Sequence, residues 1–454
     1  LSLPPYNYFF VNFFTLTSIF IFLIKKSKIH KKNNLFFFYG WIFGFGFFMT
    51  NLYWISFSLT FDENFKFLIP LTLLLIPTFL SIFFGLIFLF FIILKPKNLI
   101  SSFLVFSLLF SILEFLRGSI LTGFPWNLIA YSFSDQIRIL SIISIIGTYG
   151  FNLFCISLFI SPALIILRDS KKDLIVCFIF IISFILFYVH GFYYEKKFIS
   201  SEKKFFDYKI RSIGSNISLD RFYVNVDPTS ILEELIKISN PVSEEKTIFV
   251  WPEGILPIFS QDQISDLDKI IEENFSRNHL LIIGSNTEII NKGYKKFFNS
   301  LSVYDNKLNL LSSYNKIKLV PFGEFLPFEK VLKKLGLKSL TNNYQSFSRG
   351  EERKIINIEE KNFSLKVLPL ICYEIIYSGK LFDKADFDLI VNISEDGWFG
   401  RSIGPKQHFS HGILRAIESG KYVIRSSNNG IASIINPLGA VEQIVDFGQS
   451  GYLD

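Results

Sequence analysis

Three residues of this chain have side chains suited to covalent catalysis if the fold brings them together. Glu253 follows an apolar run in TIFVWPEGILP, Lys316 lies in YNKIKLVPFGEFLPF, and Cys372 ends the apolar half of KVLPLICYEIIY. A carboxylate among apolar neighbours is suited to act as a general base. A lysine beside a thiolate lowers the pKa of the thiol and stabilises an oxyanion. These residue types predict a cysteine nucleophile with its own base and cation.

Each of these residues also has an ordinary structural interpretation. A cysteine in an apolar run is usually a small core residue, an isolated glutamate is usually solvated, and most lysines are surface charges. Of the three cysteines, Cys155 and Cys177 lie inside long apolar segments, and Cys372 is the remaining one. Taken alone, the position of Cys372 leaves packing and catalysis equally open.

The candidate residues stand at the ends of strand-like apolar runs in the second half of the chain. Ligands collect at the carboxyl ends of strands in open α/β sheets, so Glu253 and Cys372 are expected to project at one edge. Alternating apolar patterns after about residue 205 predict an α/β domain. We predict strands at Thr247–Val250, Leu280–Ile283, Leu365–Ile371, Leu389–Ile393 and Tyr422–Ser426, helices at Ile264–Asn274 and Pro405–Ser419, and a hairpin over Asn299–Lys316.

The first 200 residues have a different composition. Half of the 454 residues are hydrophobic, 56 are Phe, and the mean hydropathy is +0.39. Much of this apolar content lies in long runs with few charges, which are long enough to cross a bilayer. We predict six spans, at Asn7–Ile24, Leu35–Thr60, Phe67–Leu94, Leu99–Leu113, Ile139–Leu167 and Leu174–Tyr194.

The loop charges predict the orientation of these spans. Cations concentrate after the first, third and fifth spans, as Lys25, Lys26, Lys28, Lys31, Lys32, Lys95, Lys97, Arg168, Lys171 and Lys172. The positive-inside rule places these loops in the cytoplasm. Everything after Tyr194 is therefore predicted to lie outside the cytoplasm, where a thiol with no disulfide partner is unusual.

The sequence contains no pattern typical of nucleic-acid-binding, nucleotide-binding or zinc-binding proteins. The net charge of +7 is not clustered, and no nucleic-acid-binding module, P-loop, GxGxxG turn or GxSxG elbow is present. His408 and His411 are three residues apart, but no further ligands complete a zinc set. We therefore predict no metal, no cofactor and no nucleic-acid partner.

Taken in order, the motifs WPE, YNKIKLVPFGEFLPF, CYE and WFG resemble the nitrilase superfamily of carbon–nitrogen hydrolases. Their place after a polytopic region is similar to the apolipoprotein N-acyltransferase family of the bacterial inner membrane. Further motifs, GFPWNLIAYS, SIGPKQH, RAIESG and RSSNNG, extend the resemblance over nearly the whole chain.

The resemblance implies a polytopic α-helical membrane bundle followed by a nitrilase-like α-β-β-α sandwich on the periplasmic face. The implied domains are residues 1–200, with about six spans, and 205–454, with one further membrane helix before Leu1 and one after Asp454. The implied catalytic triad is Glu253, Lys316 and Cys372, and the implied supporting residues are Glu324, Tyr373 and Glu374.

The implied activity is transfer of an acyl chain from a phospholipid, through a thioester on Cys372, to an apolipoprotein. The acceptor would be the N-terminal amine of its diacylglyceryl-cysteine, in the last step of bacterial lipoprotein maturation. The implied partners are the phospholipid, the apolipoprotein and the membrane, and we expect a monomer. The amphipathic segment Glu329–Lys338 is either an interfacial lid or an ordinary surface helix. Two alternative functions are a membrane-tethered nitrilase-type amidase and a non-enzymatic transporter or scaffold.

Overall fold

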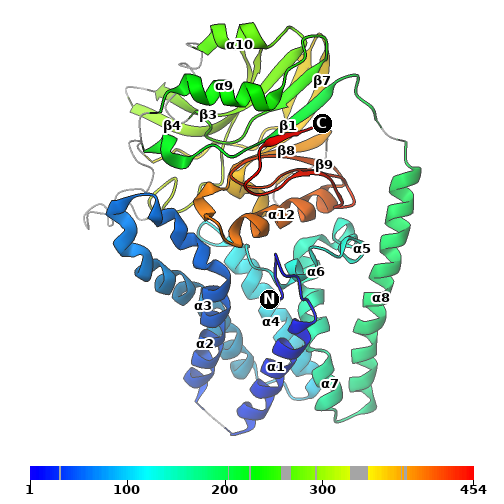
Figure 1. The fold of residues 1–454 in the computed structure, drawn as a ribbon. Coiled ribbons are helices and arrows are strands. Elements are labelled where there is room, and N and C mark those ends of the chain that lie inside the picture. The colour runs from blue at the N-terminus through cyan, green and yellow to red at the C-terminus, as the bar shows by residue number, and fades with distance from the viewer. Residues whose placement is uncertain are drawn as a thin grey trace. The chain divides into compact units, whose positions relative to one another are not determined.

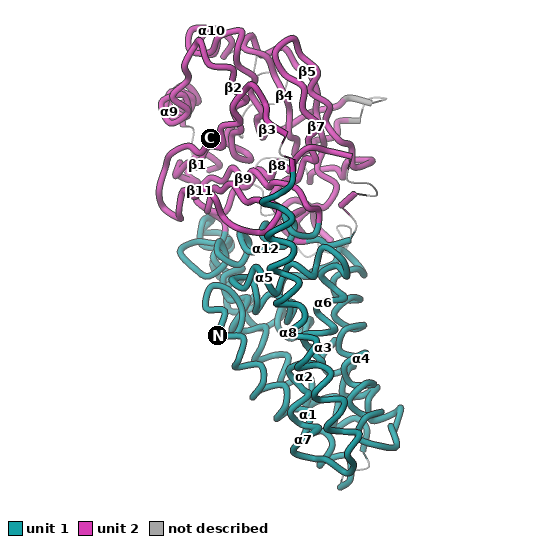
Figure 2. The backbone as a smooth tube through the Cα atoms, turned by 90° about the vertical axis from the view of Figure 1, so that its right-hand side faces the viewer, with its two compact units in different colours: residues 1–201, 377–379, 399–418 teal, residues 202–376, 380–398, 419–454 magenta. Residues whose placement is uncertain are grey.

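The computed structural model describes residues 1–29, 32–202, 204–223, 226–256, 267–291, 294–327, 346–379, 381–382 and 386–454. These residues form two compact units, coloured separately in Figure 2. Unit 1 contains Leu1–Ser201, Tyr377–Gly379 and Phe399–Glu418, and unit 2 contains Glu202–Ile376, Lys380–Trp398 and Ser419–Asp454. The predicted amphipathic segment Glu329–Lys338 lies outside the described residues.

Unit 1 is built from helices rich in Phe, Ile and Leu. They are α1 (Val11–Ile29), α2 (Asn33–Leu52), α3 (Ile69–Leu94), α4 (Leu99–Ser119), α5 (Ile137–Leu140), α6 (Ile143–Ile160), α7 (Pro162–Ile166), α8 (Lys171–Ser200) and α12 (Gly404–Ser419). Among the described residues, five stretches are long and apolar enough to cross a membrane: Asn33–Thr60, Glu63–Leu94, Leu99–Ser119, Ile143–Ile166 and Lys171–Ser200. Five predicted spans coincide with these stretches. The predicted span Asn7–Ile24 overlaps α1, which carries Lys26 and Lys28 in its last turn.

The apolar residues of unit 1 divide between its interior and its surface. Phe20, Phe84 and Phe106 are buried and contact other aromatic rings. The helix α8 instead exposes large apolar side chains such as Ile182 and Leu186. An exposed apolar surface on a long helix is the surface expected toward lipid.

Two late segments of the chain are held within unit 1. Gln407 of α12 accepts hydrogen bonds from the indoles of Trp54 and Trp126, at 3.1 Å and 2.8 Å. The Tyr377 hydroxyl donates to the carbonyl of Thr122 at 2.9 Å. These buried polar contacts explain why α12 packs with helices that precede it by more than 200 positions in the sequence.

Unit 2 contains a single 12-stranded sheet (Figure 1). Its main path runs in the order β5-β4-β3-β2-β1-β9-β8-β7-β6, with β10 beside β9, β11 beside β10 and β12 beside β1. The strands are β1 (Lys209–Ser215), β2 (Thr247–Val250), β3 (His279–Asn291), β4 (Tyr294–Asp305), β5 (Leu310–Asn315), β6 (Ile356–Glu360), β7 (Phe363–Ile371), β8 (Leu389–Glu395), β9 (Tyr422–Asn428), β10 (Ala432–Ile435), β11 (Val441–Val445) and β12 (Gly451–Leu453).

The central strands β3, β2, β1, β9, β8 and β7 run parallel to one another. Their carboxyl ends therefore lie at one edge of the sheet. The strand β5 is antiparallel to β4, which is antiparallel to β3, so β5 also ends at this edge. The ends of β2, β5 and β7 precede Glu253, Lys316 and Cys372. The sequence predicted this common edge for Glu253 and Cys372.

Alternating side chains of the strands form two apolar layers. Val250, Ile282, Val367 and Val391 belong to one buried cluster, which joins strands from both halves of the sheet. Phe249 points the other way, into a cluster with residues of α9 (Pro228–Ser239) and α10 (Asp268–Asn274). The two ends of the sheet, β5 and β6, contact each other, so the sheet is nearly closed. This architecture confirms the predicted order of an apolar helical region followed by an α/β domain.

Candidate active site

Glu253 is placed by a sharp turn directly after β2. Pro252 ends the strand, and Gly254 adopts a left-handed backbone conformation with φ of 58°. Gly284 of β3 lies against this turn, and a Cβ atom added there would come within 2.6 Å of the Glu253 Cα. The close approach of these two backbones fixes where the Glu253 side chain begins.

Lys316 lies between two carboxylates. Its Nζ donates to Glu253 Oε1 at 3.0 Å and to Glu324 Oε1 at 2.8 Å, and its side chain is buried. Burial alone lowers the pKa of Lys316, but the charges of Glu253 and Glu324 outweigh burial and raise it above its ordinary value. Lys316 therefore stays a buried ammonium, and Glu324, a predicted supporting residue, lies beside it.

Asn299 of β4 completes this arrangement, and the sequence did not identify it as a site residue. Its side-chain Nδ2 donates to Glu253 Oε1 at 2.7 Å and to Glu324 Oε1 at 2.8 Å. Its backbone carbonyl accepts from the backbone N–H of Lys316 at 2.8 Å. Asparagine is uncommon in strands, so an asparagine in the predicted hairpin was the one sequence feature that could have indicated a functional role for Asn299. The amide locks the two carboxylates and the lysine into one geometry.

Cys372 stands where β7 turns into the short 3-10 helix Cys372–Ile376. It has a φ of 48°, in the left-handed region that a non-glycine residue rarely adopts. Burial raises the pKa of the thiol well above its ordinary value, the charge of Glu253 raises it further, and the ammonium of Lys316 opposes both. The thiol is therefore protonated at neutral pH and needs a base before it can react.

Glu374 is fully buried two residues after Cys372. Its Oε1 accepts hydrogen bonds from the Tyr314 hydroxyl at 2.8 Å, the Ile317 N–H at 3.0 Å, the Lys318 N–H at 3.2 Å and Arg353 at 2.9 Å. Its Oε2 accepts from the Ile371 N–H at 3.0 Å. Burial opposes its charge, but Arg353 and these donors hold the pKa of Glu374 below its usual range. Glu374 thus ties the Lys316 segment to the strand that carries the cysteine.

The two remaining residues at this end of β7 differ in how far the sequence identified them. Tyr373, which the motif identified as a supporting residue, is buried in the same 3-10 turn as Cys372. Arg353, the cation that pairs with Glu374, was not identified. It lies outside the described strands, and no local sequence pattern relates it to Glu374.

Matches to family models show the class of protein, which is that of the carbon–nitrogen hydrolases. The model of the carbon-nitrogen hydrolase family matches residues 209–452, and the model of the apolipoprotein N-acyltransferase N-terminal domain matches residues 1–161. Among solved structures, an amidase of the nitrilase superfamily from Nesterenkonia sp. AN1 is 14% identical, with a TM-score of 0.37 over 55% of this chain and 90% of that one.

Curated relatives give the particular family. The apolipoprotein N-acyltransferase of Bradyrhizobium diazoefficiens is 31% identical over 468 residues, covering 100% of this chain and 86% of the relative. The same enzyme of Rhodopseudomonas palustris is 30% identical over 471 residues, with coverage of 100% and 86%. The chain belongs to the apolipoprotein N-acyltransferase family of carbon–nitrogen hydrolases. With five long apolar helices among the described residues, it is a bacterial membrane-bound acyltransferase.

Proposed function

We propose that this chain transfers an acyl chain from a phospholipid to the N-terminal amine of a diacylglyceryl-cysteine apolipoprotein, through a thioester on Cys372. The observation that carries the proposal is the buried ammonium of Lys316, held by Glu253 and Glu324 at the sheet edge where β7 ends before Cys372. A base, a cation and a thiol at the ends of three strands are the groups that acyl transfer through a thioester requires. The name of the curated relatives favours this activity over the amidase alternative.

In the first half-reaction, Glu253 takes the proton of the Cys372 thiol. The thiolate attacks the ester carbonyl of the phospholipid and forms a carbon–sulfur bond. Lys316, with backbone N–H groups near Tyr373, stabilises the oxyanion, a contribution for which one donor is typically worth about two to three orders of magnitude in rate. The ester carbon–oxygen bond then breaks, and lysophospholipid leaves with the proton from Glu253.

In the second half-reaction, the amine of the apolipoprotein attacks the thioester carbonyl. Glu253 accepts a proton from the amine as the new carbon–nitrogen bond forms. The carbon–sulfur bond breaks, and the proton returns to the leaving thiolate of Cys372. The products are an amide on the apolipoprotein and the free enzyme, so the cycle needs no cofactor.

The supporting carboxylates have separate roles in this cycle. Glu324 accepts from Lys316 and from the Val320 N–H at 2.8 Å, so together with Glu253 it orients the ammonium. Glu374 fixes the turn that carries Cys372 and Tyr373. Both act by holding other groups in place.

We place the protein in the bacterial inner membrane with residues 205–454 forming the catalytic domain on the periplasmic face. The loop cations after the first, third and fifth spans support this orientation. Both substrates carry long acyl chains, which explains why the catalytic residues share a chain with apolar helices. We retain the expectation of a monomer.

The test follows a labelled acyl chain from donor to acceptor. Protein in vesicles of phosphatidylethanolamine with a labelled acyl chain is mixed with a diacylglyceryl-cysteine peptide, and the label on the peptide amine is measured. Wild-type protein and the Cys155→Ala control should transfer the label, and the Cys372→Ala variant should not. Label transfer by the Cys372→Ala variant, or hydrolysis of a small amide in place of transfer by the wild type, would refute the proposal.

A further inference from the structure

Glu395, at the end of β8, is a buried carboxylate that the proposed reaction does not use. Its backbone N–H donates to Glu253 Oε2 at 3.0 Å, on the carboxylate oxygen that Lys316 does not contact. Its own side chain is 2% exposed. Burial raises the pKa of Glu395, and the charge of Arg221 opposes that shift. The residue whose backbone N–H holds Glu253 thus carries a buried carboxylate of its own, and that carboxylate requires an explanation.

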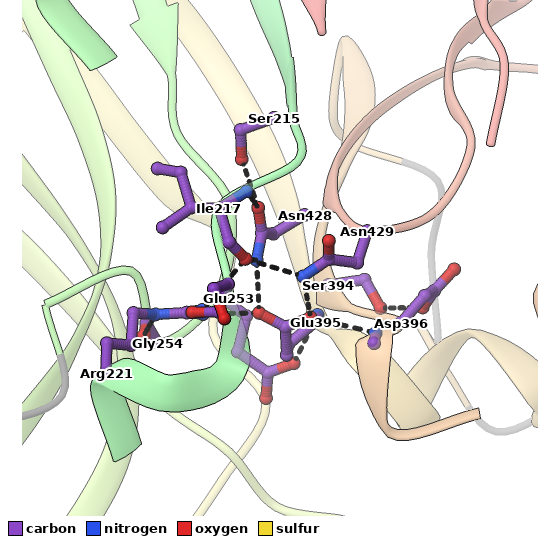
Figure 3. Close-up of polar contacts among 12 residues, drawn as sticks. Ser215, Ile217, Arg221, Glu253, Gly254, Ser394, Glu395, Asp396, Asn428 and Asn429 are labelled. Atoms are coloured by element: carbon purple, nitrogen blue, oxygen red, sulfur yellow. Dashed lines mark hydrogen bonds and ion pairs between the residues drawn. The ribbon is translucent and has the colours of Figure 1, made fainter. Parts of the chain in front are cut away.

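Arg221 is the cation that compensates Glu395. Its guanidinium forms an ion pair with Glu395 Oε2, and the side chains of both residues are almost completely buried (Figure 3). The Arg221 Nε also donates to the carbonyl of Gly254 at 3.3 Å, and its Nη1 donates to the carbonyl of Ser218 at 2.8 Å. The Arg221 guanidinium thus contacts Gly254, which follows Glu253, and Glu395, whose N–H donates to Glu253.

Asn428, at the end of β9, donates to the same oxygen of the Glu395 carboxylate as Arg221. Its Nδ2 donates to Glu395 Oε2 at 2.6 Å and to the carbonyl of Ile217 at 3.0 Å, and its Oδ1 accepts from the Ser215 hydroxyl at 2.6 Å. Glu395 Oε1 accepts from the Gly397 N–H at 2.8 Å. Figure 3 shows these contacts converging on the Glu395 side chain from the ends of neighbouring strands.

We propose that the Arg221–Glu395 ion pair is a positioning element for Glu253. The pair holds the backbone on both sides of the Glu253 carboxylate: the carbonyl of Gly254 through Arg221, and the N–H at position 395 through the fixed side chain of Glu395. The inference rests on the proposed role of Glu253 as the base, and it assigns Arg221 and Glu395 no contact with the reacting atoms.

The expected effect follows from the geometry that proton transfer demands. A catalytic group must be held to within about 0.5 Å of its productive position, and a 1 Å displacement can cost about 10²-fold in rate. Asn299 and Lys316 still hold the other oxygen of Glu253 when the ion pair is lost. We therefore expect loss of the pair to lower kcat about tenfold and to leave KM for the phospholipid unchanged.

Two sets of variants separate positioning from folding. Glu395→Gln keeps the shape of the side chain and removes its charge. Arg221→Lys tests whether a shorter cation retains part of the rate that Arg221→Met loses. Removing one partner of a buried ion pair is strongly destabilising, whereas replacing both partners by apolar side chains is often neutral. The double variant Arg221→Met with Glu395→Leu therefore tests the proposal in a protein expected to fold.

Arg211 provides a matched control. It is also a buried arginine of unit 2, which pairs with Asp454 at 2.7 Å and donates to the carbonyls of Ser239 at 2.9 Å and Asn240 at 2.8 Å. It has no contact with Glu253 among the hydrogen bonds and ion pairs of the described residues. Arg211→Met should lower thermal stability without lowering the kcat of the folded protein.

The decisive measurement is a double-mutant cycle on kcat, in vesicles of phosphatidylethanolamine with a diacylglyceryl-cysteine peptide as acceptor. Loss of the pair should cost about tenfold in the wild-type background and less than about twofold in the Glu253→Gln background, since positioning acts only through Glu253. An equal loss in both backgrounds, or an unchanged kcat in the folded double variant, would overturn this inference. If Glu253→Gln itself leaves kcat unchanged, the proposed function of Glu253 fails instead.

Discussion

Two buried carboxylates near the cysteine have contrasting surroundings. Glu374 is fully buried and accepts five hydrogen bonds, from Tyr314, Ile317, Lys318, Arg353 and Ile371. Glu253 is 7% exposed, and among the described residues its carboxylate accepts from Asn299, Lys316 and the N–H of Glu395. Both residues carry the same functional group, but they differ in how completely their oxygens are occupied.

The difference indicates which carboxylate exchanges a proton. A carboxylate that accepts several strong donors is held as an anion, and its pKa falls. That condition applies to Glu374, whose pKa is below its ordinary value. Glu253 lies in the electrostatic range of the Cys372 thiol, whose pKa its charge raises. We therefore regard Glu374 as a structural anchor and Glu253 as the base.

The substitution Glu253→Gln should have the largest effect on activity. Glutamine keeps the size of the side chain but cannot accept the thiol proton, so acyl transfer should fall about 10³-fold. The rate of label transfer to the acceptor peptide measures the change. Glu374→Gln is the matched variant, and an equal loss of rate in folded protein of both variants would remove the distinction between the two carboxylates.

Arg353→Met should have the largest effect on stability. It leaves the buried charge of Glu374 without its cation, and breaking a buried pair in this way costs about 3–5 kcal/mol. Denaturant unfolding in detergent measures the loss. The exposed Lys354, which pairs with Glu352, offers a control in Lys354→Met, for which we expect almost no change. Stability equal to wild type for Arg353→Met would contradict the anchor role of Glu374.

Gly284→Ala should affect Glu253 without touching Glu374. The added Cβ would lie 2.6 Å from the Glu253 Cα and 2.8 Å from the Pro252 carbonyl oxygen, so the Glu253 turn must shift. A shift approaching 1 Å would cost up to about 10²-fold in transfer rate. Gly46→Ala is the control, since an added Cβ there meets nothing within 4 Å. Wild-type activity in Gly284→Ala would show that the turn is not a constraint on the base.

Acid should act on the anchor in a predictable direction. Because the pKa of Glu374 is lower in the folded chain than its ordinary value of 4.5, its stabilisation is fully present above pH 4.5. It is lost as the pH falls through the lower folded pKa. The difference in unfolding temperature between wild type and Glu374→Gln should therefore stay constant from about pH 7 to about pH 4.5 and shrink below that pH. A difference that grows on acidification would contradict the direction of the pKa shift.

The sequence predicted the parts of this account that depend on local patterns. The run Thr247–Val250 coincides with β2, and Leu365–Ile371 lies within β7, so the strand ends that place Glu253 and Cys372 were identified. The motif containing both Lys316 and Glu324 also came from local sequence. Strands such as β1 and β6 and the helix α9 were not identified.

The remaining site residues depend on contacts between distant segments. Asn299 reaches Glu253 across 46 positions, and Arg221 reaches Glu395 across 174. No periodicity links such positions, because their proximity arises from the order of the strands in the sheet. The sequence also did not indicate that Phe399–Glu418 packs with the helical unit, because no local pattern links this segment to the earlier helices.

The central claim is that Cys372 carries the acyl chain, and intact-protein mass spectrometry tests it directly. Protein incubated with phosphatidylethanolamine vesicles without an acceptor should gain the mass of one acyl chain. Peptide mapping should locate that chain on Cys372, and the diacylglyceryl-cysteine peptide should remove it. An unmodified Cys372, or an acyl chain on Cys155 or Cys177, would contradict the account.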